Sequence, residues 1–280
     1  MHWQTRRFRL DLTQPRVMGI VNVTPDSFSD GGRHDDVRAA IAHCERLVAE
    51  GAALLDLGGE STRPGAPRVD AQTEWARIAD VLAAAVTLGL PVSVDTTKPE
   101  VMRRALDAGA DVINDVQALQ APGALAAVAG SGAGVCLMHM RGEPASMQEL
   151  AVYDDVVADV AAFLAARAQA AREAGIPAAC IALDPGYGFA KTSAHNLQLL
   201  AGQGRLAELG HPLLVGWSRK RTLGEITGRP VDGRLAASLA AALCAASAGA
   251  RVLRVHDVAA TVDALKVWSA VEAAKITAIA

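Results

Sequence analysis

The sequence lacks any apolar run that could cross a membrane. A transmembrane helix needs about 18 or more consecutive apolar residues, and the chain of 280 residues contains no such stretch. The segment from Met1 to Leu12 holds Arg6, Arg7 and Arg9 but not the apolar centre of a secretory signal. We therefore expect a soluble cytoplasmic protein.

Cysteine is scarce, and its spacing argues against the usual cysteine-based sites. Cys44, Cys136, Cys180 and Cys244 form no CxxC pair and have no histidine partner at metal-ligand spacing. Each lies in an apolar run, where a free cysteine packs as a small apolar side chain. We expect four buried, reduced thiols with a structural role.

Neither sign of charge dominates, and no linker divides the chain. The formal net charge of -3 speaks against the basic footprint that nucleic acids and membrane surfaces attract. An anionic ligand would have to meet a local cluster of cations. Proline and glycine are spread evenly, without a Ser/Gly-rich or Pro-rich segment, so we interpret residues 1–280 as one domain.

Short apolar runs alternate along the sequence with longer stretches in which apolar residues recur at helical spacing. This alternation is typical of βα units that build a parallel sheet. The runs that predict strands are Val17 to Val23, Ala53 to Leu57, Pro91 to Asp95, Asp111 to Asn114, Gly134 to Met138, Cys180 to Asp184, Leu213 to Trp217 and Arg251 to His256. The stretches that predict helices are Asp35 to Glu50, Ala71 to Leu88, Lys98 to Ala108, Gly123 to Ala129, Asp154 to Gly175, Ala194 to Leu200, Arg234 to Ala248 and Val258 to Ala274.

Eight such units in one chain predict an α/β fold of the (β/α)8 TIM-barrel type. Before the first of these strands, Phe8, Leu10 and Leu12 alternate with charged residues. This alternation predicts a small hairpin strand that closes the bottom of the barrel. An open nucleotide-binding sheet is the main alternative topology, but no GxGxxG follows the first strand.

Polar residues gather where the predicted strands end, which in a barrel is the face that carries the active site. Asn22, Asp95 and Asp184 come near the ends of the first, third and sixth strands. Arg254 and His256 share one face of the last strand, because side chains alternate along a strand, while Val94 and Val255 face outward. Buried charges are costly unless they are paired or bind a ligand, so this arrangement predicts a highly polar ligand.

Seven segments of the chain resemble the signatures of the dihydropteroate synthase family. The run from Met18 to Gly32 (MGIVNVTPDSFSDGG) is similar to the first signature, and Asp56 to Gly65 (DLGGESTRPG) to the second. Five shorter segments are similar to the others: Val94-Asp95-Thr96, Ile113-Asn114-Asp115, Leu183-Asp184-Pro185-Gly186 with Phe189 and Lys191, Ser218-Arg219-Lys220, and Arg254-Val255-His256-Asp257. They follow the family order from the first strand to the last, which makes the resemblance specific.

The resemblance implies an enzyme of folate biosynthesis. Such an enzyme joins p-aminobenzoate to 6-hydroxymethyl-7,8-dihydropterin pyrophosphate and releases pyrophosphate and 7,8-dihydropteroate. Asp184, Asn114 and Lys220 would hold the polar edge of the pterin, with charge-assisted hydrogen bonds worth about 1.5 to 3 kcal/mol each. Met138 and Phe189 would bracket the faces of the ring.

The same resemblance implies sites for the diphosphate and for a metal ion. Arg63, Arg254 and His256 would bind the diphosphate, because guanidinium groups match phosphate oxygens in pairs. Asn22 would give one neutral oxygen to a partly hydrated Mg2+ that also binds the diphosphate.

The resemblance also implies catalytic roles for Asp95 and Lys220. Asp95 would stabilise the positive charge that develops on the pterin methylene as the diphosphate leaves. By its position alone, Asp95 could instead cap the helix that begins near Lys98. The predicted p-aminobenzoate pocket consists of Phe28, Thr62, Pro64, Gly216 and Ser218.

Two residues depart from the family pattern. Trp217 stands where many members have a small residue, and Arg221 where many have serine; we expect both beside the p-aminobenzoate pocket. The details of sulfonamide recognition, which the family otherwise implies, depend on this region. The family also implies a homodimer, formed through the last helices.

Three alternative functions share parts of the pattern. A barrel of the methyltetrahydrofolate methyltransferase type would recognise the same ring edge but needs no diphosphate anchor. A homologue that binds pterin without catalysis would differ only in activity. A metal-dependent hydrolase barrel needs several histidines at strand ends, and only His139 and His256 qualify, with no HxH after the first strand.

Overall fold

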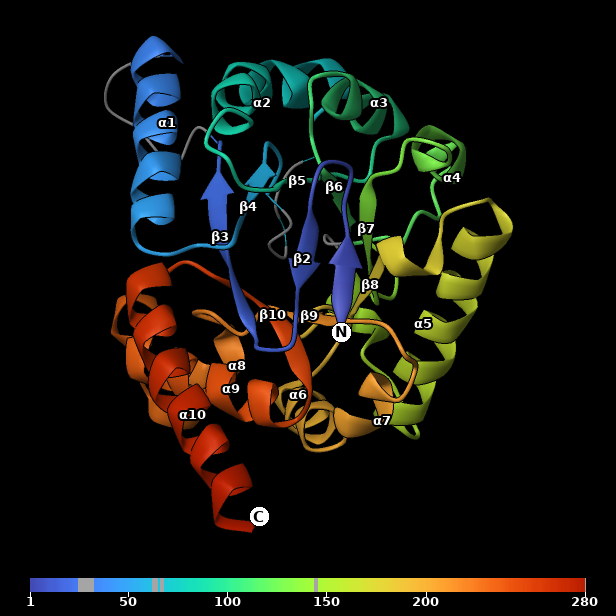
Figure 1. The fold of residues 1–280 in the computed structure, drawn as a ribbon. Helices are drawn as coiled ribbons and strands as arrows, with labels where there is room; N and C mark the ends of the chain where they lie inside the picture. Colours follow the sequence, from blue (N-terminus) through green and yellow to red (C-terminus); the bar gives the residue numbers. More distant parts are fainter. Residues whose placement is uncertain (25–32, 62–64, 66–67, 144–145, 280) are drawn as a thin grey trace.

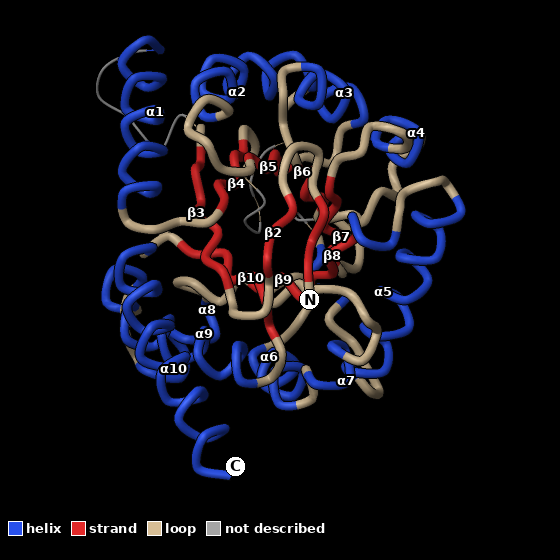
Figure 2. Tube along the Cα trace, viewed as in Figure 1, coloured by secondary structure: helices blue, strands red, loops and turns tan. Residues whose placement is uncertain are grey.

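The protein is built round a closed barrel, seen here in a computed structural model that describes the chain except for residues 25–32, 62–64, 66–67, 144–145 and 280. In the described part, eight parallel strands form the barrel and helices surround it (Figure 1, Figure 2). The strands are β3 (Arg16–Asn22), β4 (Leu54–Gly58), β5 (Val92–Asp95), β6 (Val112–Asp115), β7 (Gly134–Met138), β8 (Ile181–Asp184), β9 (Leu213–Val215) and β10 (Ala250–Val255). The predicted TIM-barrel fold is confirmed.

The register of the strands brings their polar ends to one level. The strands follow the chain order round the barrel, and β10 pairs with β3 to close it. Asp95 of β5 pairs with Gly58 on one side and with Asn114 on the other. Met138 of β7 lies opposite Asp184 of β8. Residues that are far apart in the sequence therefore meet at the carboxyl end of the barrel.

Side chains alternate between the inside of the barrel and the surrounding helices. The inner layer near the amino ends of the strands contains Met18, Leu54, Val112, Cys136, Ala182, Leu214 and Val252. The layer between strands and helices includes Leu55, Val94 and Val255. The predicted outward orientation of Val94 and Val255 is confirmed, so the residues beside them in sequence face the barrel interior.

The surrounding helices correspond to the predicted ones, with ends that differ by a few residues. They are α1 (Arg33–Ala49), α2 (Ala71–Ala85), α3 (Pro99–Asp107), α4 (Ala124–Val128), α5 (Val156–Glu173), α6 (Ser193–Ala201), α7 (Gly204–Ala207), α8 (Arg221–Thr227), α9 (Leu235–Ser247) and α10 (Val258–Ile279). The short α7 and α8 were not predicted, because a helix of one or two turns shows too little periodicity. Within the described residues, no helix combines the length and apolarity that a membrane crossing requires.

An amino-terminal hairpin lies across one end of the barrel (Figure 1). It pairs β1 (His2–Gln4) with β2 (Arg9–Asp11) in antiparallel fashion. Trp3 and Leu12 are fully buried against the inner layer of the barrel, and Nε1 of Trp3 donates a hydrogen bond of 2.9 Å to the carbonyl oxygen of Cys180. The predicted closing hairpin is confirmed, although β1 itself was not predicted.

The substitution Trp3→Ala should lower the free energy of unfolding by about 3 to 5 kcal/mol, because it removes a large side chain from the closed end of the barrel. Trp3→Phe should cost less, since it keeps an aromatic ring and loses mainly one hydrogen bond, worth about 1 kcal/mol. Urea denaturation followed by circular dichroism measures both. A loss below about 1 kcal/mol for Trp3→Ala would contradict this role of the hairpin.

The cysteines follow the expectation with one exception. Cys44, Cys136 and Cys180 are buried and free, whereas Cys244 is free and exposed. The expectation of four buried thiols was wrong for Cys244 because α9 buries Ala241, Ala242, Ala245 and Ala246, and Cys244 lies on the opposite face of that helix.

Candidate functional site

A hydrogen-bonded network joins four strand ends inside the mouth of the barrel. Nε of Arg254 on β10 donates to Oδ2 of Asp56 on β4 at 2.6 Å, and Nη2 of Arg254 donates to Oδ2 of Asp95 on β5 at 3.1 Å. The side-chain amide of Asn114 on β6 donates to Oδ2 of Asp56 at 3.2 Å. The strand ends that carry predicted site residues therefore converge on one place.

Asp56 is the residue of this network that sequence reasoning missed as a site residue. Its side chain is fully buried, and its Oδ1 atom has no hydrogen-bond partner among the described residues. Leu55 and Leu57 on either side made the segment look like ordinary core. The strand alternation used for Asp95 would also have placed Asp56 on the inner face.

Asp95 contacts Arg254 and does not cap a helix. The helix α3 begins with Lys98 as its N-cap, without a side-chain capping bond, so the alternative role of Asp95 as a cap is wrong. Burial raises the pKa of Asp95 above its usual value, while the charge of Arg254 opposes this rise and the Asp56 carboxylate adds to it. Two carboxylates thus share one guanidinium, and that pairing holds Arg254 in place.

The charges of Asp184 and Lys220 act on each other at the mouth of the barrel. Burial raises the pKa of Asp184 to about 6, against the charges of Lys220, Arg254 and Lys191 and a 2.7 Å hydrogen bond from the backbone of Gly186. Burial lowers the pKa of Lys220 to about 8, and the Asp184 carboxylate opposes this fall. A ligand that pairs with the charged forms of both groups would therefore stabilise those forms on binding.

An apolar cluster flanks the charged groups. Nζ of Lys220 lies 4.4 Å from the centre of the Phe189 ring, which packs against Met138 and its neighbours. The buried members of this cluster are Val116, Met138, Met140, Met147 and Ala190. The mouth thus offers a flat-faced, polarisable surface beside hydrogen-bonding groups, which suits a planar polar ring.

The loops after β9 and β10 are tied together beside Arg254. Oγ of Ser218 lies 3.0 Å from Nδ1 of His256 and accepts a 3.2 Å hydrogen bond from the backbone of His256. Arg219 makes two hydrogen bonds to the Asp257 carboxylate, of 3.1 and 2.6 Å. Gly216 lies beside Arg254, because a Cβ placed on Gly216 would lie 3.8 Å from the carbonyl oxygen of Arg254.

Asn22, Asp95 and the backbone of Glu60 surround Gly58. A Cβ placed on Gly58 would lie 3.8 Å from Cβ of Asp95 and 4.0 Å from Oδ1 of Asn22. Among the described residues, no three histidine, cysteine, aspartate or glutamate side chains gather as a metal site. A cation held by Asn22 would therefore take most of its ligands from water and from a bound anion, a pattern that Mg2+ accepts.

Trp217, which we expected beside the p-aminobenzoate pocket, follows β9 and stands between Gly216 and Ser218. Its side chain is buried among the residues between the barrel and the helices, with its ring centre 4.5 Å from that of Tyr187. Arg221 is 87 % exposed and pairs with Glu225 within α8.

The predicted site residues Phe28, Thr62, Arg63 and Pro64 lie outside the described residues.

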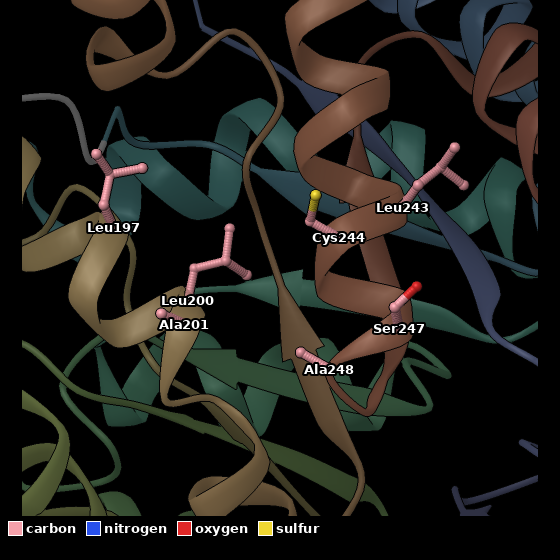
Figure 3. A pocket seen from close by; sticks show the side chains of 7 residues that line it. All are labelled: Leu197, Leu200, Ala201, Leu243, Cys244, Ser247 and Ala248. Carbon is pink, nitrogen blue, oxygen red and sulfur yellow. The ribbon is translucent and has the colours of Figure 1, made fainter.

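A separate groove of about 650 Å³ lies between α6 and α9, away from the strand ends just described (Figure 3). Its lining residues are Leu197, Leu200, Ala201, Leu243, Cys244, Ser247 and Ala248. This groove carries no charged side chain among its lining residues, so the polar mouth is the better candidate for a site of chemistry.

The comparisons with known proteins agree with the geometry of the mouth. The family described as "Pterin binding enzyme" matches residues 18–256. The chain is 50% identical over 273 residues to a dihydropteroate synthase of Neisseria meningitidis serogroup C, covering 96% of each. It is similar, with TM-score 0.90 and 58% identity, to the Xanthomonas albilineans dihydropteroate synthase solved with 4-aminobenzoic acid, covering 95% of this chain and 96% of that one. It is also similar to the Yersinia pestis dihydropteroate synthase in a sulfonamide drug complex, with TM-score 0.92, 46% identity and 98% and 100% coverage.

Proposed function

The chain belongs to the dihydropteroate synthase family of pterin-binding enzymes, and from this premise we propose how its barrel mouth carries out the family's reaction. The enzyme condenses 6-hydroxymethyl-7,8-dihydropterin pyrophosphate with p-aminobenzoate, giving 7,8-dihydropteroate and pyrophosphate. One observation above all supports the assignment of roles: Arg254 bridges Asp56 and Asp95, and its charge also acts on Asp184. Acidic and basic binding groups thus occupy one mouth.

The pterin ring lies against the acidic side of the mouth. The ionised Asp184 carboxylate accepts hydrogen bonds from the ring N-H groups, and Asn114 can both donate and accept along the same edge. Lys220 donates to a ring oxygen or nitrogen. Met138 and Phe189 contact the ring faces, as the apolar cluster around them favours.

The diphosphate lies on the basic side. Arg254 uses Nε and Nη2 to hold Asp56 and Asp95, and a guanidinium has five N-H donors, so further donors remain for phosphate oxygens. His256, positioned through Ser218, adds a second donor on the neighbouring loop. Arg63 is proposed as a third cation by its place in the family motif.

We propose that Asn22, beside Gly58, would contribute one oxygen ligand to Mg2+, and that water and the diphosphate would supply the others. When bound, the ion would neutralise charge on the leaving diphosphate. The side chain of Asn22 would orient the ion without adding negative charge to an already acidic mouth.

The reaction breaks the bond between the pterin methylene carbon and the diphosphate oxygen, and the electron pair leaves with the diphosphate. Positive charge then spreads from the methylene into the ring, and Asp95 in its ionised form stabilises that charge. The burial that raises the pKa of Asp95 makes its charge act through little screening water. The amine nitrogen of p-aminobenzoate forms the new bond to the methylene carbon and loses a proton to solvent.

The p-aminobenzoate pocket lies beside the loop after β9. Ser218 is 8% exposed and lies at the mouth with His256, while Phe28, Thr62 and Pro64 are assigned by motif. An aromatic amine is a weak nucleophile that needs positioning more than deprotonation. Sulfonamide drugs resemble this substrate, and the sulfonamide complex of the Yersinia pestis relative supports the proposal that they compete for the same pocket.

We also propose that residues 1–280 form one domain, that the protein acts in the cytoplasm, and that it forms a homodimer. The groove between α6 and α9 supports the dimer because most of its lining is apolar (Figure 3). Leu197, which lines the groove, is 45% exposed. An exposed apolar groove favours association with a second surface.

Affinity for the pterin ring should be highest between about pH 6 and pH 8. Asp184 must lose its proton to accept from the ring, and its pKa is raised to about 6, so binding should weaken as the pH falls below that value. Lys220 must keep its proton to donate, and its pKa is lowered to about 8, so binding should weaken again above it. Calorimetric titration with 6-hydroxymethyl-7,8-dihydropterin across this range measures the profile, and affinity that stays constant from about pH 5 to pH 9 would contradict it.

The proposed function is tested by mixing the purified protein with the pterin pyrophosphate, p-aminobenzoate and Mg2+ and following pyrophosphate release. We expect release that depends on both substrates and yields 7,8-dihydropteroate. Tight pterin binding without release would indicate a homologue that only binds. Methyl transfer that depends on cobalamin would indicate the methyltransferase type instead.

A further inference from the structure

Lys191 is a buried cation that the proposed reaction does not use. It lies in the loop after β8 and belongs to the same family motif as Asp184. Its side chain is almost fully buried. Nζ lies 2.9 Å from Nδ1 of His139 and donates to the carbonyl oxygens of Gly186 and Phe189, each at 3.0 Å. The three protons of the ammonium group thus each have an acceptor. Burial lowers the pKa of Lys191 to about 7, and the Asp184 carboxylate opposes this fall.

Two of these acceptors belong to the turn that carries the pterin-facing groups. The backbone of Phe189 donates to the carbonyl of Gly186 at 3.1 Å, so Lys191 holds both ends of one turn. The backbone of Gly186 also donates to Oδ1 of Asp184, and Phe189 lies under Lys220. The position of this turn therefore determines where the carboxylate and the ring-facing phenyl group point.

The third acceptor joins the turn to the barrel wall. The backbone of His139 donates to the carbonyl of Asp184 at 2.9 Å, and its ring packs edge-on against Phe163 of α5, with centres 4.9 Å apart. Gly186 has φ +69, and a Cβ there would lie only 1.9 Å from the carbonyl oxygen of His139, so the turn sits directly against the end of β7. Burial lowers the pKa of His139 to about 2, which keeps its ring neutral and its Nδ1 able to accept.

We infer that Lys191 is a positioning residue of the pterin site, which it serves by fastening the turn from Gly186 to Phe189 to His139. It does not touch the substrate; it acts through Asp184 and Phe189. The inference rests on the function proposed above, since it assigns Lys191 to the ring side of that site and not to the diphosphate side.

The test is Lys191→Met, which keeps a long side chain and removes all three donors. In the full-length protein, the dissociation constant for 6-hydroxymethyl-7,8-dihydropterin should rise roughly tenfold or more, because several buried hydrogen bonds that orient the ring site are lost. The dissociation constant for inorganic pyrophosphate should change less than about twofold, because Arg254 and His256 lie at the end of β10 and contact none of the three acceptors of Lys191. Lys266→Met makes the same change at a lysine that is 72% exposed and should alter neither constant.

A second variant separates positioning from simple loss of stability. His139→Phe keeps a ring against Phe163 but removes the acceptor for Lys191, so it should shift the pterin constant in the same direction by a smaller factor. If Lys191→Met does not fold, this variant decides the question. Unchanged pterin affinity, or an equal loss for pterin and pyrophosphate, in a folded variant would overturn the inference. A wild-type protein that fails to bind the pterin would overturn the proposed function and this inference with it.

Discussion

Asp184→Ala is expected to reduce affinity for the pterin ring by a factor of about 10² to 10⁴, which corresponds to two charge-assisted hydrogen bonds of about 1.5 to 3 kcal/mol each. Asp184 ends β8 in the mouth, and the charges of Lys220, Arg254 and Lys191 favour its ionised form. Affinity for inorganic pyrophosphate should change little, because Asp184 belongs to the ring side. Calorimetric titration with each ligand separates the two effects.

Asp184→Asn is the matched control for this prediction. The amide keeps the size of the side chain and an oxygen that can accept from the backbone of Gly186, as Oδ1 does now at 2.7 Å. Because the folded protein raises the pKa of Asp184 to about 6, the ionised carboxylate costs stability above that pH, and the neutral amide removes this cost. Near pH 7, about the middle of the range from pH 6 to pH 8 in which pterin should bind best, the variant should unfold at an equal or higher temperature and still bind pterin weakly. A variant that binds pterin like the wild type would refute the role of the charge.

Arg254→Ala is expected to have the second large effect, on both stability and diphosphate binding. Removal of the guanidinium leaves Asp56 and Asp95 without their shared partner, and breaking a buried ion pair typically costs about 3 to 5 kcal/mol. Affinity for inorganic pyrophosphate should fall by about 10² or more, since charge-assisted bonds to phosphate are lost. The Arg254→Ala variant should lose less affinity for the pterin ring than the Asp184→Ala variant does.

Arg254→Lys distinguishes charge from geometry at this position. A lysine keeps one positive charge near Asp56 and Asp95, so the free energy of unfolding should recover in part. The planar fork is lost, so pyrophosphate affinity should remain low. An Arg254→Ala protein as stable as the wild type, with ring and pyrophosphate affinities reduced equally, would contradict the bridging role of Arg254.

The barrel could be predicted because its strands are buried on both faces and end in polar residues. Runs such as Ile181–Asp184 are apolar until the residue that reaches the mouth, so the strand and its functional end are visible together. The strand β1 and the helix α7 are only three and four residues long, which is too short for any period to appear. Trp3 gives no local signal of its burial, because the barrel end that covers it is built from distant strands.

The site was predictable where a single residue breaks an apolar pattern at a strand end, as Asp95 and Arg254 do. Asp56 was missed because it lies between two leucines in the middle of a strand, where it pairs with Ser93, two residues before Asp95. Strand alternation still places it on the same inner face as Asp95. The burial of the Trp217 side chain between the barrel and the helices follows from tertiary packing, which the motif does not show. The partners of Lys191 could not be foreseen, since they depend on how the turn after β8 folds back onto the end of β7.

The most direct measurement is a crystal structure of the protein with 6-hydroxymethyl-7,8-dihydropterin pyrophosphate, collected without p-aminobenzoate. We expect the ring edge within hydrogen-bond distance of Asp184 and Asn114, and the diphosphate against Arg254 and His256. A ligand bound in the groove between α6 and α9, or one whose diphosphate lies at Asp184 with its ring at Arg254, would contradict the account.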